Sequence, residues 1–229
     1  MNRNKVTLWL EIFLLPAAYM AVQWIFTGLL SLTGVCQEIS RTVIGLFLLP
    51  LLFILYRKNN PLPRQRVSAG SLMQKIFLTI SCAVFLVLLS MVLGGKNAER
   101  SATPFWDMAG AVFIGPINEE LVYRGFSLSK SRELMKTPWA VFLNACLFAA
   151  AHTGILQMGL SFLAGAMFSL LVICCGNLIF PSVAHICVNL VLTRLEPVPV
   201  APAIGGIIGC GVLFCAFYIY RKKNDFRHK

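Results

Sequence analysis

Residues 73–94 read MQKIFLTISCAVFLVLLSMVLG, a stretch in which Lys75 is the only charged residue. A helix needs roughly 20 apolar residues to cross the hydrocarbon core of a bilayer, so this stretch predicts a membrane-spanning helix. Seven further apolar segments fit the same rule, the short ones with tilting or shielding by neighbours. They are 6–32, 42–56, 104–126, 138–152, 155–174, 178–193 and 201–220. The sequence therefore predicts an all-α fold, a polytopic transmembrane helical bundle of about eight helices.

The composition excludes a soluble globular protein. Of the 229 residues, 58% are hydrophobic and 13% are charged, whereas soluble domains carry about 25% charged residues. Apolar segments recur along the whole chain, so we expect a single integral membrane domain over residues 1–229, surrounded by the lipid bilayer. The first apolar segment ends without the small-residue cleavage pattern of a signal peptide, so we expect it to remain as the first helix.

The distribution of basic residues accounts for the net charge of +11. If the N-terminus is cytoplasmic, 16 of the 20 Lys and Arg residues lie at the cytoplasmic ends of the segments. The four at the outer ends are Arg41, Lys96, Arg100 and Arg194. This bias follows the positive-inside rule and predicts that both termini are cytoplasmic. The basic excess needs no nucleic acid, and we expect no nucleic-acid partner.

The eight cysteines give no sign of a disulfide framework or of a metal site. Nearly all of them lie within apolar segments, without the paired spacing of metal ligands. Free cysteine tends to be buried as a small apolar residue. We therefore expect these residues in the core, and we expect no metal and no other cofactor.

Two adjacent carboxylates lie inside an apolar segment, where ionisable residues are costly and indicate function. Glu119 and Glu120 are followed by Arg124. In a helix Glu120 and Arg124 share a face and can pair, while Glu119 points about 100° away. One carboxylate is then neutralised and the other stays free for chemistry. The alternative is a structural ion-pair network at the interface, where Arg124 begins a basic stretch.

Two histidines lie in helical patterns that can face Glu119. His152 follows Phe148 by four residues, and His185 precedes Asn189 by four residues, so the members of each pair project from one face. Each feature has a plainer interpretation, because a single histidine can be a hydrogen-bonded core residue and an asparagine can join two helices. Their joint occurrence favours a buried polar cluster.

The spacing around Lys136 supports this cluster. A helical hairpin that breaks at Thr137-Pro138 would place Glu119 and His152 at equal depths, each roughly 24 Å from the turn at a rise of about 1.5 Å per residue. The two side chains are then expected to lie on neighbouring antiparallel helices at the same level.

The three patterns, in this order, resemble the motifs of the CAAX protease and bacteriocin-processing family, also called the Abi family of glutamate intramembrane proteases. They read Glu119-Glu120-x-x-x-Arg124, Phe148-x-x-x-His152 and His185-x-x-x-Asn189. The resemblance covers about residues 105–192, the core of that family, while the flanking segments add only hydropathy. Tyr123 stands where the family has an aromatic residue, often phenylalanine, which leaves the implied activity intact.

The resemblance implies an intramembrane endopeptidase, a hydrolase of the glutamate type. Glu119 and His152 would hold and activate the attacking water, and His185 and Asn189 would stabilise the oxyanion. These residue types suit the chemistry, because a carboxylate in a medium of low dielectric constant can act as a general base and amide or imidazole groups can donate to a tetrahedral oxyanion.

The same resemblance implies that Glu120 and Arg124 support the site. The implied partner is a peptide or protein substrate at the membrane: a prenylated C-terminal tail, a bacteriocin precursor or a membrane-linked regulator. The sequence does not choose among them. The short chain and the lack of an organellar address favour the plasma membrane of a bacterium.

Two other classes of protein compete with this interpretation. A zinc-dependent membrane peptidase also uses Glu and His, but the chain has no H-E-x-x-H pair, and adjacent glutamates do not share a helix face. A transporter, a proton relay or a non-catalytic immunity protein could bury the same polar groups. Transporters often show inverted repeats, and no repeat is evident in this chain.

Overall fold

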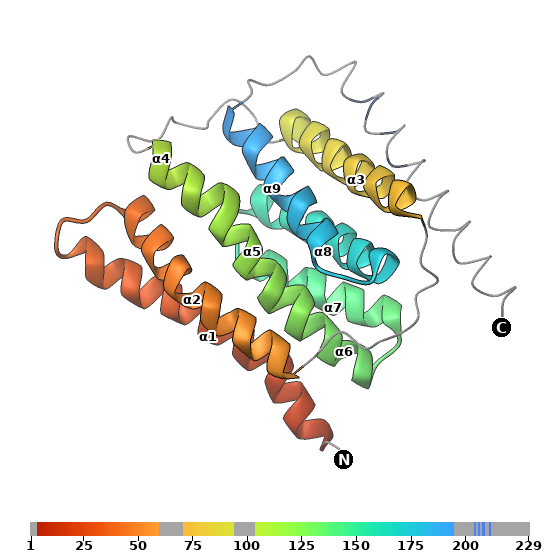
Figure 1. The fold of residues 1–229 in the computed structure, drawn as a ribbon, viewed down its shortest axis with the longest axis horizontal. Coiled ribbons are helices and arrows are strands. Elements are labelled where there is room, and N and C mark those ends of the chain that lie inside the picture. Colours follow the sequence, from red (N-terminus) through yellow and green to blue (C-terminus); the bar gives the residue numbers. More distant parts are fainter. Residues whose placement is uncertain are drawn as a thin grey trace, which may run out of the picture.

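The computed structural model describes residues 4–59, 71–93 and 104–194, together with four single positions, Ile204, Gly206, Ile208 and Gly211. Within these residues every regular element is a helix, as the sequence predicts (Figure 1). Apart from those four helical positions, the eighth predicted segment, 201–220, lies outside the described residues. The count of eight membrane helices therefore stays a prediction.

Seven helices run through the described residues. They are α1 (Lys5–Ser31), α2 (Gln37–Asn59), α3 (Leu72–Leu93), a composite helix from α4 to α6, α7 (Thr137–Ala150), α8 (Ile155–Cys175) and α9 (Ile179–Arg194). Four of them, α1, α2, α3 and α8, are long and apolar enough to cross a membrane, while α7 and α9 are shorter apolar helices. This set of helices is typical of a membrane protein.

The composite helix carries the two adjacent glutamates. It consists of α4 (Pro104–Asp107), η1 (Met108–Ile114), α5 (Gly115–Glu119), η2 (Glu120–Leu128) and α6 (Ser129–Leu134). Figure 1 shows these pieces as one long helix through the bundle. The segments η1 and η2 are π-helical. This form is rare in proteins, and where it occurs it is frequently found at functional sites. All nine residues of η2 are buried, against α1, α2, α7 and α8, so the carboxylates lie in the bundle's interior.

The predicted bounds of two helices differ most from the structure. The second helix is Gln37–Asn59 rather than 42–56, and the composite helix continues to Leu134 rather than ending at 126. Hydropathy detects only the apolar part of a helix, whereas backbone hydrogen bonding continues through polar residues such as Glu38 and Lys130. The polar ends therefore add turns on either side of the apolar part.

The shortness of α7 determines the depth of His152. Its 14 residues span about 21 Å, less than the roughly 30 Å of a bilayer core. It starts beside Pro138, as the hairpin prediction requires, and it packs against α8. The turn to α8 contains His152 and ends at Gly154, whose φ of 86° suits glycine. His152 therefore lies part of the way along the bundle.

The cysteine prediction is partly confirmed. Cys82, Cys174 and Cys175 are buried, in a core cluster that α3, α8 and α9 share. Cys187 is exposed on the outside of α9, so the expectation is wrong for this residue. Cys210 and Cys215 lie outside the described residues. An exposed thiol on a membrane helix is compatible with lipid contact, since cysteine is weakly polar.

Candidate active site

A buried ion pair joins Glu120 and Arg124. Nη1 of Arg124 lies 3.0 Å from Oε1 of Glu120, and both side chains are fully buried. The second terminal nitrogen of Arg124 donates to the carbonyl oxygen of Gly165 on α8 at 3.3 Å, and the guanidinium lies 4.3 Å from the ring centre of Phe148. The pair predicted from the spacing of four residues is present, and it connects η2 to both α7 and α8.

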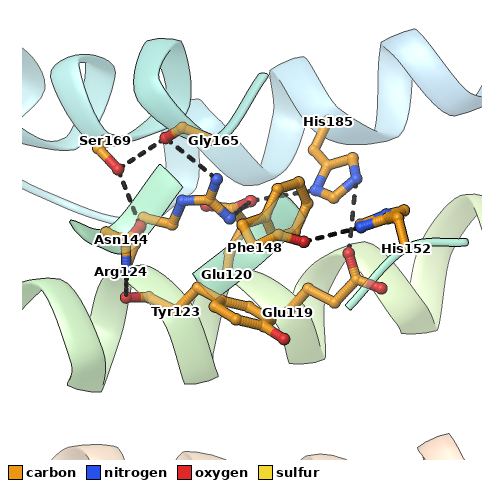
Figure 2. Close-up of polar contacts among 10 residues, drawn as sticks. All are labelled: Glu119, Glu120, Tyr123, Arg124, Asn144, Phe148, His152, Gly165, Ser169 and His185. Atoms are coloured by element: carbon orange, nitrogen blue, oxygen red, sulfur yellow. Dashed lines mark hydrogen bonds and ion pairs between the residues drawn. The ribbon is translucent and has the colours of Figure 1, made fainter. Parts of the chain in front are cut away.

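His185 lies between the two carboxylates. Its Nδ1 is 3.0 Å from Oε1 of Glu120, and its Nε2 is 3.7 Å from Oε2 of Glu119 (Figure 2). The ring stacks on Phe168 with centroids 4.9 Å apart. Since a carboxylate oxygen only accepts, Nδ1 donates to Glu120. That bond and the stacking fix the ring so that Nε2 faces Glu119.

Glu119 and His152 both line one cavity. The Glu119 side chain is 27% exposed, in contrast to the fully buried Glu120. Nδ1 of His152 lies 2.8 Å from the carbonyl oxygen of Phe148. Because a carbonyl oxygen only accepts, Nδ1 carries the hydrogen, and Nε2 of His152 keeps its lone pair. The site thus offers a carboxylate and an imidazole acceptor to whatever enters the cavity.

Asn189 also lines the cavity, and its amide nitrogen donates to the carbonyl oxygen of Ala111 on η1 at 2.8 Å. An amide nitrogen carries two hydrogens, so this bond leaves the second one for another acceptor. His185, Glu120 and Arg124 are not among the residues that line the cavity. The six predicted site residues thus form one region, with three at the cavity wall and three behind it.

A second polar network, which the sequence patterns did not predict as part of the site, supports η2 from behind. The amide nitrogen of Asn144 on α7 donates to the carbonyl oxygen of Tyr123 at 2.7 Å. The hydroxyl of Ser169 on α8 lies 3.0 Å from the amide oxygen of Asn144 and 2.7 Å from the carbonyl oxygen of Gly165. Asn144 and Ser169 are fully buried. Their signal in the sequence was polarity at helical spacing within apolar segments, Asn144 being four residues before Phe148.

The cavity has a volume of about 830 Å³ and lies between α1, α2, the composite helix and the turn between α7 and α8. Its wall on α1 includes Tyr19, Gln23, Trp24 and Thr27. The motifs gave the first helix no part in the site, and the structure places it at the cavity wall. Its signal was a polar residue at every fourth position from Tyr19 to Thr27.

The described residues contain no group of three or more His, Cys, Asp or Glu side chains arranged to hold a metal ion. Glu119, Glu120 and His185 are close to one another, but one oxygen of Glu120 already accepts from both Arg124 and His185. Arg124 and His185, the donors nearest to the two glutamates, are thus already engaged in hydrogen bonds with Glu120.

A comparison with protein families gave a match to the family described as type II CAAX prenyl endopeptidase Rce1-like, over residues 101–191. This segment, less than half of the chain, coincides with the predicted core at about 105–192 and runs from α4 into α9. The match confirms the resemblance that the three motifs indicate. Neither the curated proteins nor the solved structures gave a match.

Proposed function

We propose that this chain, similar over residues 101–191 to the Rce1-like CAAX prenyl endopeptidases, is an intramembrane endopeptidase of the glutamate type. The match supports a membrane peptidase in general terms, and the residue roles are our proposal. The observation that carries them is the difference between two neighbouring carboxylates. Glu120 is buried against Arg124, whereas Glu119 is partly exposed at a cavity that His152 also lines.

In the proposed mechanism one water molecule lies between Glu119 and Nε2 of His152. It donates one hydrogen bond to each, which orients its oxygen toward the scissile carbonyl carbon. Glu119 removes a proton as the oxygen–carbon bond forms, and the carbonyl oxygen becomes an oxyanion. Glu119 then passes the proton to the amide nitrogen, the carbon–nitrogen bond breaks, and the products are a carboxylic acid, which keeps the second proton of the water, and an amine.

Two donors are available for the oxyanion in this proposal. The first is the side-chain amide of Asn189. One of its two hydrogens bonds to the carbonyl oxygen of Ala111, and the other is free to bond to the oxyanion. Nε2 of His185 is the second: it lies 3.7 Å from Glu119, just behind the cavity wall, and it donates only from a ring that carries hydrogens on both nitrogens, because Nδ1 already donates to Glu120.

Glu120 and Arg124 act as positioning residues in this proposal. Both lie behind the cavity wall and contact His185 and the helices around it rather than the cavity. Their pair holds the helix that carries Glu119 against α7, α8 and α9. The substrate is a peptide or protein at the membrane; prenylated tails and unprenylated precursor peptides are both within the proposed class.

The direct test is cleavage by the purified protein in detergent, followed by mass spectrometry. The probes are a farnesylated C-terminal tail peptide and an unprenylated leader-type peptide. Glu119→Gln should abolish cleavage and leave the thermal unfolding temperature nearly unchanged, because the side chain is 27% exposed and its contact with Nε2 of His185, at 3.7 Å, is longer than the 3.0 Å pair of Glu120 and Arg124. The matched control is Glu133→Gln, a similarly accessible glutamate of α6, which should cleave normally. Near-normal turnover in Glu119→Gln would show that the base is another residue.

A further inference from the structure

Two polar side chains on α1, at the wall of the cavity, carry oxygen atoms that have no hydrogen-bond partner in the described part of the chain. They are Oε1 of Gln23 and Oγ1 of Thr27, both buried from solvent. Both residues line the cavity. A buried polar atom without a partner costs about 1–3 kcal/mol, and each one in a folded protein needs an explanation.

The wall of the cavity opposite α1 also contains a buried polar atom without a hydrogen-bond partner among the described residues. Tyr123 on η2 lines the cavity and is 1% exposed, and its hydroxyl has no partner among the described residues. Its ring is held edge-on against Phe148 at 5.1 Å, and its backbone oxygen accepts from Asn144. The hydroxyl is therefore fixed in place at the cavity, one helical turn from Glu119.

The distance between Gln23 and Thr27 along α1 matches the distance between successive N–H groups on one edge of an extended peptide. Residues four apart on a helix are about 6 Å apart along its axis. Along one edge of an extended peptide the main-chain N–H groups recur every second residue, at about 6.6–6.8 Å. When the two side chains rotate toward the cavity, the oxygens of Gln23 and Thr27 can therefore accept from two successive N–H groups on that edge.

The cavity has room for such a peptide. Its volume of about 830 Å³ falls in the range of roughly 300–1,000 Å³ that ligand sites occupy. At Gly28, one residue beyond Thr27, an added Cβ would meet nothing within 4 Å, so the space beside α1 is open. A stretched chain along α1 would pass Glu119 and His152, which line the same cavity.

We propose that the face of α1 formed by Gln23 and Thr27 binds the main chain of the substrate in an extended conformation and sets its position relative to Glu119. This inference rests on the proposed peptidase function. It assigns a substrate-binding role to a helix outside the matched residues 101–191. Recognition through the main chain accepts varied side chains and excludes a helical segment, whose N–H groups are already bonded.

Two conservative variants test the kinetic consequence. Thr27→Val and Gln23→Leu keep the approximate shape and remove the acceptors, so each should raise KM about three- to tenfold with kcat within about twofold. Thr27→Val should not lower the unfolding temperature, because its hydroxyl has no partner in the free protein. The matched control is Thr79→Val on α3, whose hydroxyl bonds only within its own helix and away from the cavity; its KM should not change.

A cross-linking experiment tests the binding mode without needing cleavage. Thr27→Cys is combined with Glu119→Gln, Cys36→Ala and Cys187→Ala, and unprenylated leader-type peptides carry one cysteine at successive positions. Disulfide formation should be strongest at every second peptide position, as an extended chain requires. A period of three to four, no positional preference, or an unchanged KM in both kinetic variants would overturn the proposal. If wild-type protein cleaves no probe while the two-residue pattern appears, the peptidase function fails and the binding site stands.

Discussion

Glu119 and Glu120 show how adjacent residues of one type can acquire different chemistry. Glu120 accepts from Arg124 and His185 and is fully buried. Glu119 points to a neighbouring face of the helix, where it meets the cavity and, at 3.7 Å, Nε2 of His185. The 100° between consecutive helical residues is enough to put one carboxylate in a structural pair and leave the other for a reaction. Their substitution should therefore have different consequences.

For Glu120→Gln we expect lower stability as well as lower activity. The change leaves the charge of Arg124 uncompensated in the interior, and breaking a buried ion pair costs about 3–5 kcal/mol. Thermal unfolding in detergent and cleavage should both be measured, with Glu119→Gln as the reference, since that variant should lose activity alone. Equal unfolding temperatures for the two variants would contradict the assignment of Glu120 as a positioning residue.

For Asn189→Ala we expect turnover to fall about 10²- to 10³-fold with little change in KM, as for the loss of one oxyanion donor. The matched control is Thr193→Val, one turn further along α9, whose hydroxyl bonds only to carbonyl oxygens of its own helix. It should retain full turnover. Activity lost on chelation and restored by Zn²⁺ would instead make Glu119, His152 and His185 metal ligands and contradict the donor role.

At the scale of the elements, the helices could be predicted from the sequence and their polar ends could not. The positions and lengths of the apolar segments were enough to locate every helix that the structure describes, because a helix surrounded by lipid must be apolar along its length. They could not show that α2 starts at Gln37 or that the composite helix ends at Leu134, since helical hydrogen bonding does not depend on hydropathy. The π-helical form of η2 was equally hidden, because hydropathy does not distinguish the backbone hydrogen bonds of a π-helix from those of an α-helix.

The candidate site was predictable where it repeats a motif. Spacing placed Glu120 with Arg124 and brought His152 and His185 toward Glu119. It could not show that His185 lies between both carboxylates, because rotation of α9 against η2 depends on the packing of its ring on Phe168. The α1 wall was missed because its polar residues belong to no motif and acquire meaning only from the cavity opposite them.

The contact between α7 and η2 gives a prediction at this scale. Asn144→Leu should lower stability by about 1–3 kcal/mol, because the carbonyl oxygen of Tyr123 loses its donor in a fully buried place. Unfolding in detergent measures the loss. Ser169→Ala is the milder control, since Ser169 also bonds within its own helix. A larger loss for Ser169→Ala than for Asn144→Leu would show that η2 is not held through Asn144.

At the scale of the whole molecule, the cavity is unevenly placed along the bundle. Figure 1 shows the α1–α2 turn and α4 at one end, and the start of α1 and the end of α6 at the other. The cavity's lining includes Ser31 and Gln37 beside the α1–α2 turn, and both residues are exposed. The short α7 leaves space on this side of His152. The cavity therefore opens toward the end that carries the α1–α2 turn.

The orientation of the bundle is a prediction from the basic residues. Arg57 and Lys58 end α2, and Lys136 lies between α6 and α7, so these charges gather at the end away from the α1–α2 turn. The positive-inside rule places that end in the cytoplasm. Reporter fusions at Lys58 and Lys136 should both report a cytoplasmic location. A signal from the outer side at either position would contradict this orientation.

Orientation and cavity together predict the side from which substrate arrives. If the basic end is cytoplasmic, the cavity mouth at Ser31 faces outward, and the proposed peptidase receives peptides from the outer side. A membrane-impermeant maleimide added to intact cells should label Ser31→Cys in a Cys36→Ala, Cys187→Ala background, and the bulky adduct should block cleavage. Lys58→Cys, exposed at the opposite end, should be labelled only after the membrane is permeabilised. The reverse pattern would place the mouth in the cytoplasm and favour prenylated tails, which are made there, as substrates.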